Sequence, residues 1–280
     1  SHEILHKRQN ILPAMDRVNA GFTHKIIWIS DLHQTVSGEV EGVASAARLE
    51  QLIAQINTYH ADAACCVASG DLCDTGSDEE YQALNQRLAG LKLPFLPMIG
   101  NHDNPARFGQ AMVLPGQVQP GYAQFRYDLA GDVTLLCLDT YLAGSDAGTM
   151  DKARLDWLAD QLRQTAERRV LVFTHHPPGP LGLGPLDAMP LLDHQPFVDL
   201  LRAAPQVEYL LCGHVHRPVS GVIGRIPFAT LRALAHQTKA PTTVWDWDDF
   251  VAKEERPQYA VILIAADRIV IQFTDIEDPA

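Results

Sequence analysis

Histidine, aspartate and asparagine side chains gather at the ends of five short apolar segments of this chain. These side chains are Asp31, His33, Asp71, Asn101, His102, His175, His176, His214 and His216. Imidazole, carboxylate and amide oxygen together form a ligand set that suits Zn, Fe, Mn or Co. Side chains two residues apart in an extended segment point to the same side, as Asp31 and His33 would. The set is larger than one tetrahedral ion would use, so it predicts two ions that share Asp71 as a bridge.

The segments that must position these groups alternate between strands and helices. Apolar runs predict strands at residues 25–30, 63–69, 95–99, 133–138, 170–173 and 207–211. Helical periodicity predicts helices at 44–59, 77–89 and 151–165, with a capping box at the start of the second. After residue 218 the pattern predicts strands at 219–223, 227–231, 259–264 and 269–273. Ligands of layered α/β folds bind beyond the carboxyl ends of the strands, so the polar groups should share one edge.

Composition limits the partners and the compartment. The 280 residues include 22 Lys and Arg against 34 Asp and Glu, a net charge of -12, which disfavours a nucleic-acid polymer as partner. No apolar run reaches the ~20 residues of a membrane span, and residues 1–24 do not resemble a signal peptide. The five cysteines lack C-x-x-C spacing and are interpreted as buried thiols of a reducing compartment. We therefore expect a cytoplasmic protein without a membrane partner.

Five motifs carry a family resemblance. D-x-H stands at residues 31–33, G-D-x-x-D at 70–74, G-N-H-D at 100–103, H-H-P-P at 175–178 and G-H-x-H at 213–216. All five are intact, and their order resembles the signature of the calcineurin-like metallophosphoesterases. The resemblance covers about two thirds of the chain. It implies an α/β four-layer α/β/β/α sandwich, in which two central mixed β-sheets are flanked by helices and carry a dinuclear metal centre at one edge.

The resemblance also implies roles for individual residues. The ligands of one ion would be Asp31, His33, Asp71 and His216. Those of the other would be Asp71, Asn101, His175 and His214. A metal-bridging hydroxide would attack phosphorus, His102 would protonate the leaving group or stabilise the phosphate, and Asp74 would orient His102. His175 is preferred to His176 because the related ligand lies two residues before the proline, which leaves His176 beside the ligands.

Domain organisation follows from the same resemblance. Residues 25–218 would form the catalytic domain, preceded by an N-terminal extension at 1–24. The strand-rich segment 219–280 would complete the sandwich and contribute to a homodimer or a higher homo-oligomer.

The third motif and its surroundings narrow the substrate. Protein phosphatases carry arginine before this motif and glutamate after the histidine, whereas this chain has Ile99 and Asp103. Purple acid phosphatases have a tyrosine shortly after the bridging aspartate, where this chain has Cys73 and Asp74. The chain looks most like the class III cyclic nucleotide phosphodiesterases and their glycerophosphodiesterase relatives. This predicts hydrolysis of small phosphodiesters, with 3′,5′-cyclic AMP favoured. A glycerophosphodiesterase, a broad phosphomonoesterase and a non-catalytic metal-binding scaffold stay as alternatives.

Several polar residues outside the motifs have open roles. His194 follows a Gly/Pro-rich loop and could reach a substrate, and Arg107 could meet a phosphate. His236 is interpreted as a surface or core residue and not as a ligand. An acidic aromatic stretch is interpreted as a loop or an oligomer contact, and it comprises Trp245, Asp246, Trp247, Asp248 and Asp249.

Overall fold

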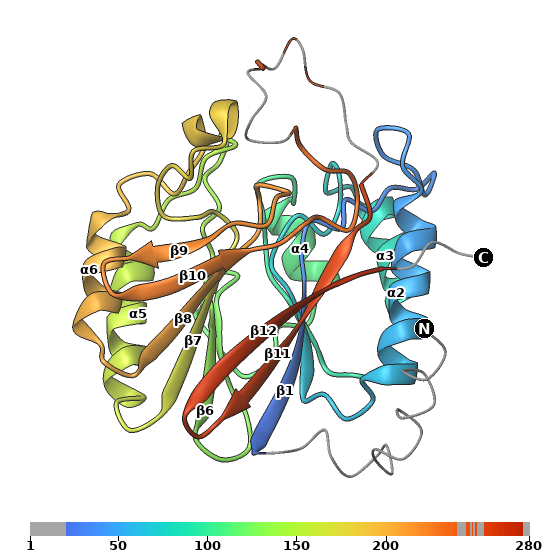
Figure 1. The fold of residues 1–280 in the computed structure, drawn as a ribbon. Coiled ribbons are helices and arrows are strands. Elements are labelled where there is room, and N and C mark those ends of the chain that lie inside the picture. Colours follow the sequence, from blue (N-terminus) through green and yellow to red (C-terminus); the bar gives the residue numbers. More distant parts are fainter. Residues whose placement is uncertain (1–20, 240–244, 247, 249, 251–254, 277–280) are drawn as a thin grey trace, which may run out of the picture.

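Two stacked β-sheets with helices on both outer sides make up the described part of the chain (Figure 1). The structure is a computed structural model, and it describes residues 21–239, 245–246, 248, 250 and 255–276. The layer order is helices, sheet, sheet, helices, which confirms the expected four-layer α/β sandwich with two mixed sheets.

The smaller sheet has five strands in the order β12-β11-β1-β2-β3. Their bounds are β1 (Phe22–Ile29), β2 (Cys65–Ala68), β3 (Phe95–Pro97), β11 (Gln258–Ala265) and β12 (Arg268–Asp275). β1 runs parallel to β2 and antiparallel to β11, so the sheet is mixed. The last two strands of the chain therefore pair beside the first.

The larger sheet has seven strands in the order β4-β5-β6-β7-β8-β10-β9. Their bounds are β4 (Gln117–Val118), β5 (Phe125–Asp128), β6 (Val133–Cys137), β7 (Arg169–Thr174), β8 (Val207–Cys212), β9 (Ser220–Ile223) and β10 (Ile226–Thr230). β6, β7, β8 and β10 are parallel to one another. β5 pairs antiparallel with β6 at one side of this group, and β9 pairs antiparallel with β10 at the other.

The alternation of side chains along β1 shows how the layers are held together. Ile27 and Ile29 pack against helices on the outer side of the smaller sheet, in a cluster with Leu49. Ile26 and Trp28 point the other way, into the core between the two sheets. Successive side chains of a strand face opposite sides, so a strand that is apolar throughout must be covered on both faces.

Helices cover both outer faces (Figure 1). Their bounds are α2 (Ser45–Tyr59), α3 (Asp78–Leu88), α4 (Pro105–Ala111), α5 (Lys152–Gln164), α6 (Gln195–Ala203) and the short 3-10 helix η1 (Gly184–Ala188). The expected capping box is present, since the Ser77 hydroxyl accepts from Glu80 N and the Glu80 carboxylate accepts from Ser77 N. None of the helices in the described residues has both the length and the apolar character for crossing a membrane.

The predicted strands and helices are all present, with small shifts of their ends. β1 begins at Phe22, three residues before the predicted start, because it keeps pairing with β11 across a bulge at residues 22–24. α4, α6, η1, β4 and β5 were not predicted. The predicted domain boundaries at residues 24 and 218 stay predictions, and most of the N-terminal extension lies outside the described residues.

Candidate dinuclear metal centre

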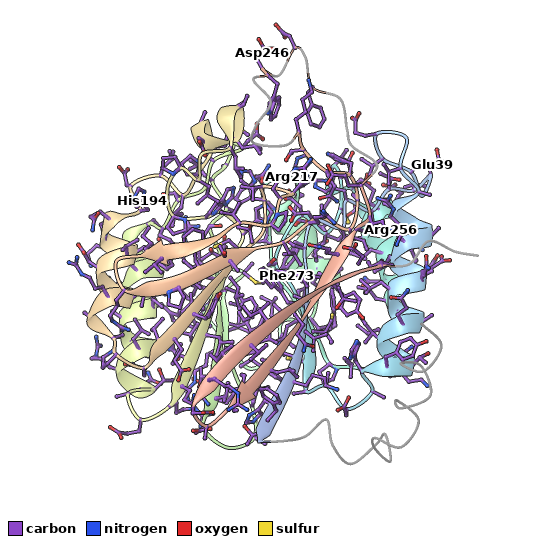
Figure 2. The ribbon with its side chains drawn as sticks, in the orientation of Figure 1. Glu39, His194, Arg217, Asp246, Arg256 and Phe273 are labelled. Atoms are coloured by element: carbon purple, nitrogen blue, oxygen red, sulfur yellow. The ribbon has the colours of Figure 1, made fainter. Side chains whose placement is uncertain are left out.

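The carboxyl ends of five strands bring the predicted ligands to one edge of the sandwich. Asp31 and His33 follow β1, the residues from Asp71 to Asp74 follow β2, and Asn101 and His102 follow β3. His175 follows β7 in the other sheet, and His214 and His216 follow β8. Arg217, labelled in Figure 2, comes directly after His216 and marks this edge.

The backbone at these ligands is unusual. Among the described residues, seven that are not glycine have positive φ, and five of them are predicted ligands: Asp31 (54°), His33 (39°), Asp71 (50°), His214 (72°) and His216 (52°). The extended conformation assumed from the two-residue spacing is therefore wrong, although the side chains do converge. A left-handed backbone conformation is energetically unfavourable for an L-residue other than glycine, so it persists only where the surrounding structure imposes it. Such residues are typical of functional sites.

One buried cluster contains Asp31, His33, Asp71 and His216. The Nε2 atoms of His33 and His216 lie 3.2 Å apart. His216 Nε2 is 3.4 Å from Asp31 Oδ1, and His33 Nε2 is 3.6 Å from Asp71 Oδ2. Burial alone would raise the pKa of Asp31, but His216 lowers it to about 2, so this carboxylate is ionised at neutral pH.

Hydrogen bonds on the outer side fix the two histidines of this cluster. His33 Nδ1 lies 3.2 Å from the Asp74 carboxylate, and His216 Nδ1 lies 2.8 Å from the His236 carbonyl oxygen. A carbonyl can only accept, so His216 Nδ1 carries the proton, and the same assignment suits His33. When both rings are neutral, as metal ligands must be, their Nε2 lone pairs face each other beside two carboxylates. A cation between them would remove this repulsion, so the donor set fits a metal ion.

A second group surrounds His175 and His214. His175 Nδ1 donates to the Ser69 carbonyl at 2.8 Å, while its Nε2 lies 3.0 Å from Asn101 Oδ1 and 3.2 Å from Asp71 Oδ2. His214 Nε2 is buried and has no hydrogen-bond partner among the residues that the structure describes. Burial, with help from His175, lowers the pKa of His214 to about 3, so its imidazole is neutral and able to ligate a metal. These donors also fit a cation, and Asp71 lies in reach of both groups.

His176 lies beside this second group but is engaged elsewhere. One ring nitrogen of His176 lies close enough to those of His175 and His214 for the three to form a possible metal cluster. However, His176 Nδ1 lies 2.8 Å from the Thr140 hydroxyl, and His176 Nε2 lies 3.1 Å from the Asp146 carbonyl. Both ring nitrogens are thus satisfied by the loop at residues 140–148, which favours His175 as the ligand.

Asp74 and His102 differ in part from the expected arrangement. The Asp74 carboxylate hydrogen-bonds His33, and its Oδ1 is 4.0 Å from His102 Nδ1. The Asp74 main-chain carbonyl is what accepts from His102 Nδ1, at 2.8 Å. Burial lowers the pKa of His102, but Asp71 and the Asp74 carbonyl outweigh this effect and raise it overall. Asp74 thus contacts both histidines, one through its side chain and the other through its backbone.

Two glycines allow the ligand loops to approach each other. A Cβ atom on Gly70 would lie 2.3 Å from His175 Nδ1, and one on Gly100 would lie 2.2 Å from Asp71 Oδ1. Gly70 also has a φ of 104°, which L-residues rarely adopt. The glycines of the G-D and G-N-H motifs are therefore required by close packing against the ligands.

A cavity of about 440 Å³ opens over both ligand groups. Its lining residues are His33, Glu41, Asp71, Asp74, Asn101, His102, Asp146, Leu186, Met189, His214, His216, His236, Thr238 and Phe250. The apolar lining residues are Leu186 of η1, Met189 directly after η1, and Phe250, while the other lining residues are polar or acidic. No lysine or arginine is among these lining residues.

Comparison with known proteins agrees with this geometry. The family model described as calcineurin-like phosphoesterase matches residues 24–218. The chain belongs to this family. It is a metallophosphoesterase and hence a hydrolase.

Its relatives include named phosphodiesterases. A protein of Rhodopseudomonas palustris named "Probable cyclic nucleotide phosphodiesterase" is 35% identical over 259 residues, which are 88% of this chain and 90% of the relative. Glycerophosphodiester phosphodiesterase GpdQ of Enterobacter lignolyticus is 32% identical over 188 residues, 66% of this chain and 68% of the relative. The 3′,5′-cyclic adenosine monophosphate phosphodiesterase CpdA of Escherichia coli is 28% identical over 195 residues, 69% and 70% of the two chains.

A solved structure shares the fold. A dimetal phosphatase from Danio rerio superposes with a TM-score of 0.70 at 15% sequence identity, covering 92% of this chain and 98% of the other.

Sequence reasoning on this metallophosphoesterase missed two residues next to the ligands. Asp103 is buried, and its carboxylate accepts hydrogen bonds from Leu72 N, Cys73 N, Gly100 N and the Tyr81 hydroxyl. Burial and the nearby Asp71 raise the pKa of Asp103 to about 6. Asp103 stands in the G-N-H-D motif, so a signal was present. His236 also lines the cavity. The centroid of its ring lies 4.8 Å from that of His216 and 5.6 Å from that of His33, and no motif includes it.

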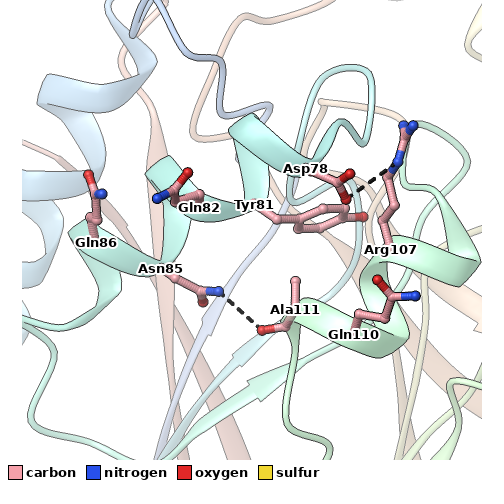
Figure 3. A pocket seen from close by; sticks show the side chains of 8 residues that line it. All are labelled: Asp78, Tyr81, Gln82, Asn85, Gln86, Arg107, Gln110 and Ala111. Atoms are coloured by element: carbon pink, nitrogen blue, oxygen red, sulfur yellow. Dashed lines mark hydrogen bonds and ion pairs between the residues drawn. The ribbon is translucent and has the colours of Figure 1, made fainter.

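None of the other described residues singled out in the sequence lines the cavity, although Trp245 packs behind its apolar wall. Arg107 pairs with Asp78 at 3.5 Å and lines a separate groove between α3 and α4 (Figure 3). His194 begins α6 and does not line the cavity (Figure 2). Trp245 is buried against Leu183 and Leu186. Trp247 and Asp249 lie outside the described residues.

Proposed function

We propose that this metallophosphoesterase hydrolyses small phosphodiesters, with 3′,5′-cyclic AMP as the favoured substrate. The observation that carries the proposal is that, in the part of the chain that the structure describes, neither lysine nor arginine lines the cavity. Among the described residues, the phosphate charge is then balanced by the metal centre and a protonated His102. This balance suits a diester with one negative charge better than a monoester with two. The relatives named as cyclic nucleotide phosphodiesterases support the choice of substrate.

We assign the metal ligands as follows. One ion would be held by Asp31, His33, Asp71 and His216, and the other by Asp71, Asn101, His175 and His214. When bound, two ions of Fe, Mn, Zn or Co would supply a water of lowered pKa as nucleophile and neutralise phosphate oxygens.

His102 is assigned as the residue that protonates the leaving alkoxide or stabilises the phosphate. Its Nδ1 donates to the Asp74 carbonyl, which directs Nε2 away from this anchor, and the side chain lines the cavity. The raised pKa of His102 favours the protonated ring that a general acid needs. Asp74 is a positioning residue that anchors His102 by its backbone and His33 by its carboxylate.

The alternatives differ in what favours them. A glycerophosphodiester substrate keeps the same metals and mechanism, and the GpdQ relative favours it as second candidate. A phosphomonoester is disfavoured by the missing cationic side chains. A non-catalytic scaffold is disfavoured because every predicted ligand and His102 are present together at one edge.

Three further expectations belong to the proposal. We place the protein in the cytoplasm, where the five buried free thiols would stay reduced. We assign residues 25–218 to catalysis and residues 219–280 to completing the sandwich. A homodimer or a higher homo-oligomer is the expected assembly.

Parallel hydrolysis assays test the proposed function. The purified protein would be assayed on 3′,5′-cyclic AMP, glycerophosphodiesters and p-nitrophenyl phosphate, with Mn, with Zn and with chelator. Rapid, chelator-sensitive turnover of cyclic AMP is expected. Activity confined to glycerophosphodiesters would move the substrate but keep the centre, whereas activity on the monoester alone would overturn the diesterase proposal.

A further inference from the structure

Two exposed carboxylates on the cavity rim belong to none of the possible metal clusters among the described residues. Glu41 and Asp146 line the cavity together with His102. We infer that Glu41 and Asp146 determine substrate specificity by excluding substrates with more negative charge than the single charge of a diester phosphate. The inference rests on the proposed function and extends it to the charge of the substrate.

A tight turn fixes the position of Glu41. Val40 and Val43 exchange two main-chain hydrogen bonds, of 3.0 and 2.8 Å, and the central residues Glu41 and Gly42 have φ values of 49° and 76°. Turns with both central residues left-handed favour asparagine, aspartate and glycine. A glutamate there is conformationally unfavourable, and the turn holds this residue, which is exposed, in the lining of the cavity. Such a departure from the usual turn residue is typical of a position with a function.

A buried histidine fixes the loop that carries Asp146. The Asp146 carbonyl accepts from His176 Nε2 at 3.1 Å, and a Cβ on Gly148 would lie 2.4 Å from His176 Nδ1. Gly148 N also donates to the Pro190 carbonyl at 3.0 Å. The backbone on both sides of Asp146 is thus anchored, while Asp146 itself is exposed and belongs to the lining of the cavity.

The charges around the cavity show why these two carboxylates matter. Three other carboxylates belong to the ligand clusters, namely Asp31, Asp71 and Asp74. Two divalent ions carry four positive charges and a protonated His102 would add one, so the five carboxylates offset these charges in full. Leu186 and Met189 form an apolar part of the lining and supply no cation. A second negative charge on the substrate would therefore meet repulsion from the rim, and an uncharged leaving group would not.

The test compares a diester with a monoester of the same leaving group. Bis-p-nitrophenyl phosphate carries one negative charge, and p-nitrophenyl phosphate carries two at mildly alkaline pH. The ratio of their kcat/KM values would be measured for the wild type, Glu41→Gln, Asp146→Asn and the double variant. We expect the preference for the diester to fall about three- to tenfold with each substitution, because a like charge is removed from the rim.

Salt provides a readout that a structural effect would not change. Repulsion between exposed charges is screened at high ionic strength. Added salt should therefore lower the diester preference of the wild type and leave that of the double variant nearly constant.

Two control variants remove a carboxylate elsewhere. Glu39→Gln changes an exposed residue of the loop that carries Glu41, and Glu39 does not line the cavity (Figure 2). Asp132→Asn changes an exposed residue before β6, at the end opposite to the ligands. Both should keep the wild-type ratio. An unchanged ratio in the double variant, or an equal fall in the controls, would overturn the inference.

A binding measurement separates this inference from the proposed function. Calorimetry on the metal-loaded protein would compare dimethyl phosphate, a monoanion, with methyl phosphate, a dianion. The double variant should gain affinity for the dianion relative to the monoanion. An equal ratio of the two affinities in the wild type and the double variant would overturn the inference. If the wild type hydrolyses neither nitrophenyl ester, the proposed function fails. The ratio of the two binding affinities still decides whether the rim excludes charge.

Discussion

Each ligand histidine with a fixed tautomer has one ring nitrogen anchored outside the centre and the other directed into it. The anchors are the Ser69 carbonyl for His175, the His236 carbonyl for His216 and the Asp74 carboxylate for His33. Anchors of this kind orient an imidazole before a metal binds. The motifs predicted the ligands, because the residue types and their order were present in the sequence. They could not identify the anchors, since two of the three are main-chain oxygens with no residue-specific signal.

Replacement of His102 should separate catalysis from metal binding. We expect His102→Ala to lower kcat by about 100-fold or more while two ions stay bound, because we propose His102 as a general acid outside the ligand set. Steady-state kinetics and elemental analysis after desalting would measure both quantities. His194→Ala, at the start of α6, should match the wild type. Loss of metal together with activity would contradict the assigned role.

Addition of one methyl group at Gly100 should displace a ligand. The new Cβ would lie 2.2 Å from Asp71 Oδ1, so Gly100→Ala is expected to lower metal affinity about 10- to 100-fold. Gly109→Ala in α4 is the matched control, because nothing lies within 4 Å of its Cβ position. Calorimetric titration with Mn or Zn would compare the two variants. Equal affinities would show that the loops can move apart without cost.

At the scale of elements, Asp103 joins the loops after β2 and β3 to helix α3. Its carboxylate accepts from Leu72 N at 3.1 Å, from Gly100 N at 2.9 Å and from the Tyr81 hydroxyl at 2.8 Å. The two loops carry Asp71 and the Asn101–His102 pair. One buried side chain therefore sets the separation between ligands from neighbouring strands.

Neutralisation of Asp103 should weaken both the fold and the metal centre. Asp103→Asn keeps the shape but presents an amide to backbone donors, so the free energy of unfolding should fall by about 1–3 kcal/mol. Tyr81→Phe removes one hydrogen bond and should cost about 0.5–1.5 kcal/mol. Urea unfolding and metal titration would test both variants. An Asp103→Asn protein with wild-type stability and metal affinity would contradict this role.

Most of the elements that were not predicted are short or lack a periodic pattern, whereas α6 has buried Phe197, Val198 and Leu201 at helical spacing, so its pattern was visible. α4 spans only Pro105–Ala111 and contains Gly109, a poor helix former. β5 alternates charged and aromatic residues and ends beside a turn, and β4 has two residues. The longer helices were predicted because apolar spacing and the Ser77–Glu80 capping box were visible. His236 was missed for a different reason, since tertiary folding brings it to the cavity from a segment without a motif.

At the scale of the whole molecule, the two ends of the described chain meet in one sheet. β11 pairs antiparallel with β1, with Ile26 opposite Ile262, and both side chains are fully buried between the sheets. The motifs end at His216, yet the strand that carries Asp31 and His33 is supported by residues about fifty positions beyond them. The sequence predicted these late strands but not which strand they pair with, because pairing depends on the tertiary fold.

A core substitution in β11 tests this support. Ile262→Ala should lower the free energy of unfolding by about 2–5 kcal/mol, because it leaves a cavity between the sheets. Val222→Ala changes an exposed residue of the edge strand β9 and should stay within about 0.5 kcal/mol of the wild type. Equilibrium unfolding in urea would measure both. Similar losses in the two variants would contradict the placement of β11 in the core.

The central claim is that two metal ions at this edge enable the chain to hydrolyse phosphodiesters. The most direct measurement is turnover of bis-p-nitrophenyl phosphate by metal-depleted protein as Mn or Zn is added back, with bound metal counted in the same samples. We predict no turnover in chelator and a rise in turnover that levels off when two ions are bound per chain. Turnover that persists in chelator, or no turnover with two ions bound, would contradict the claim.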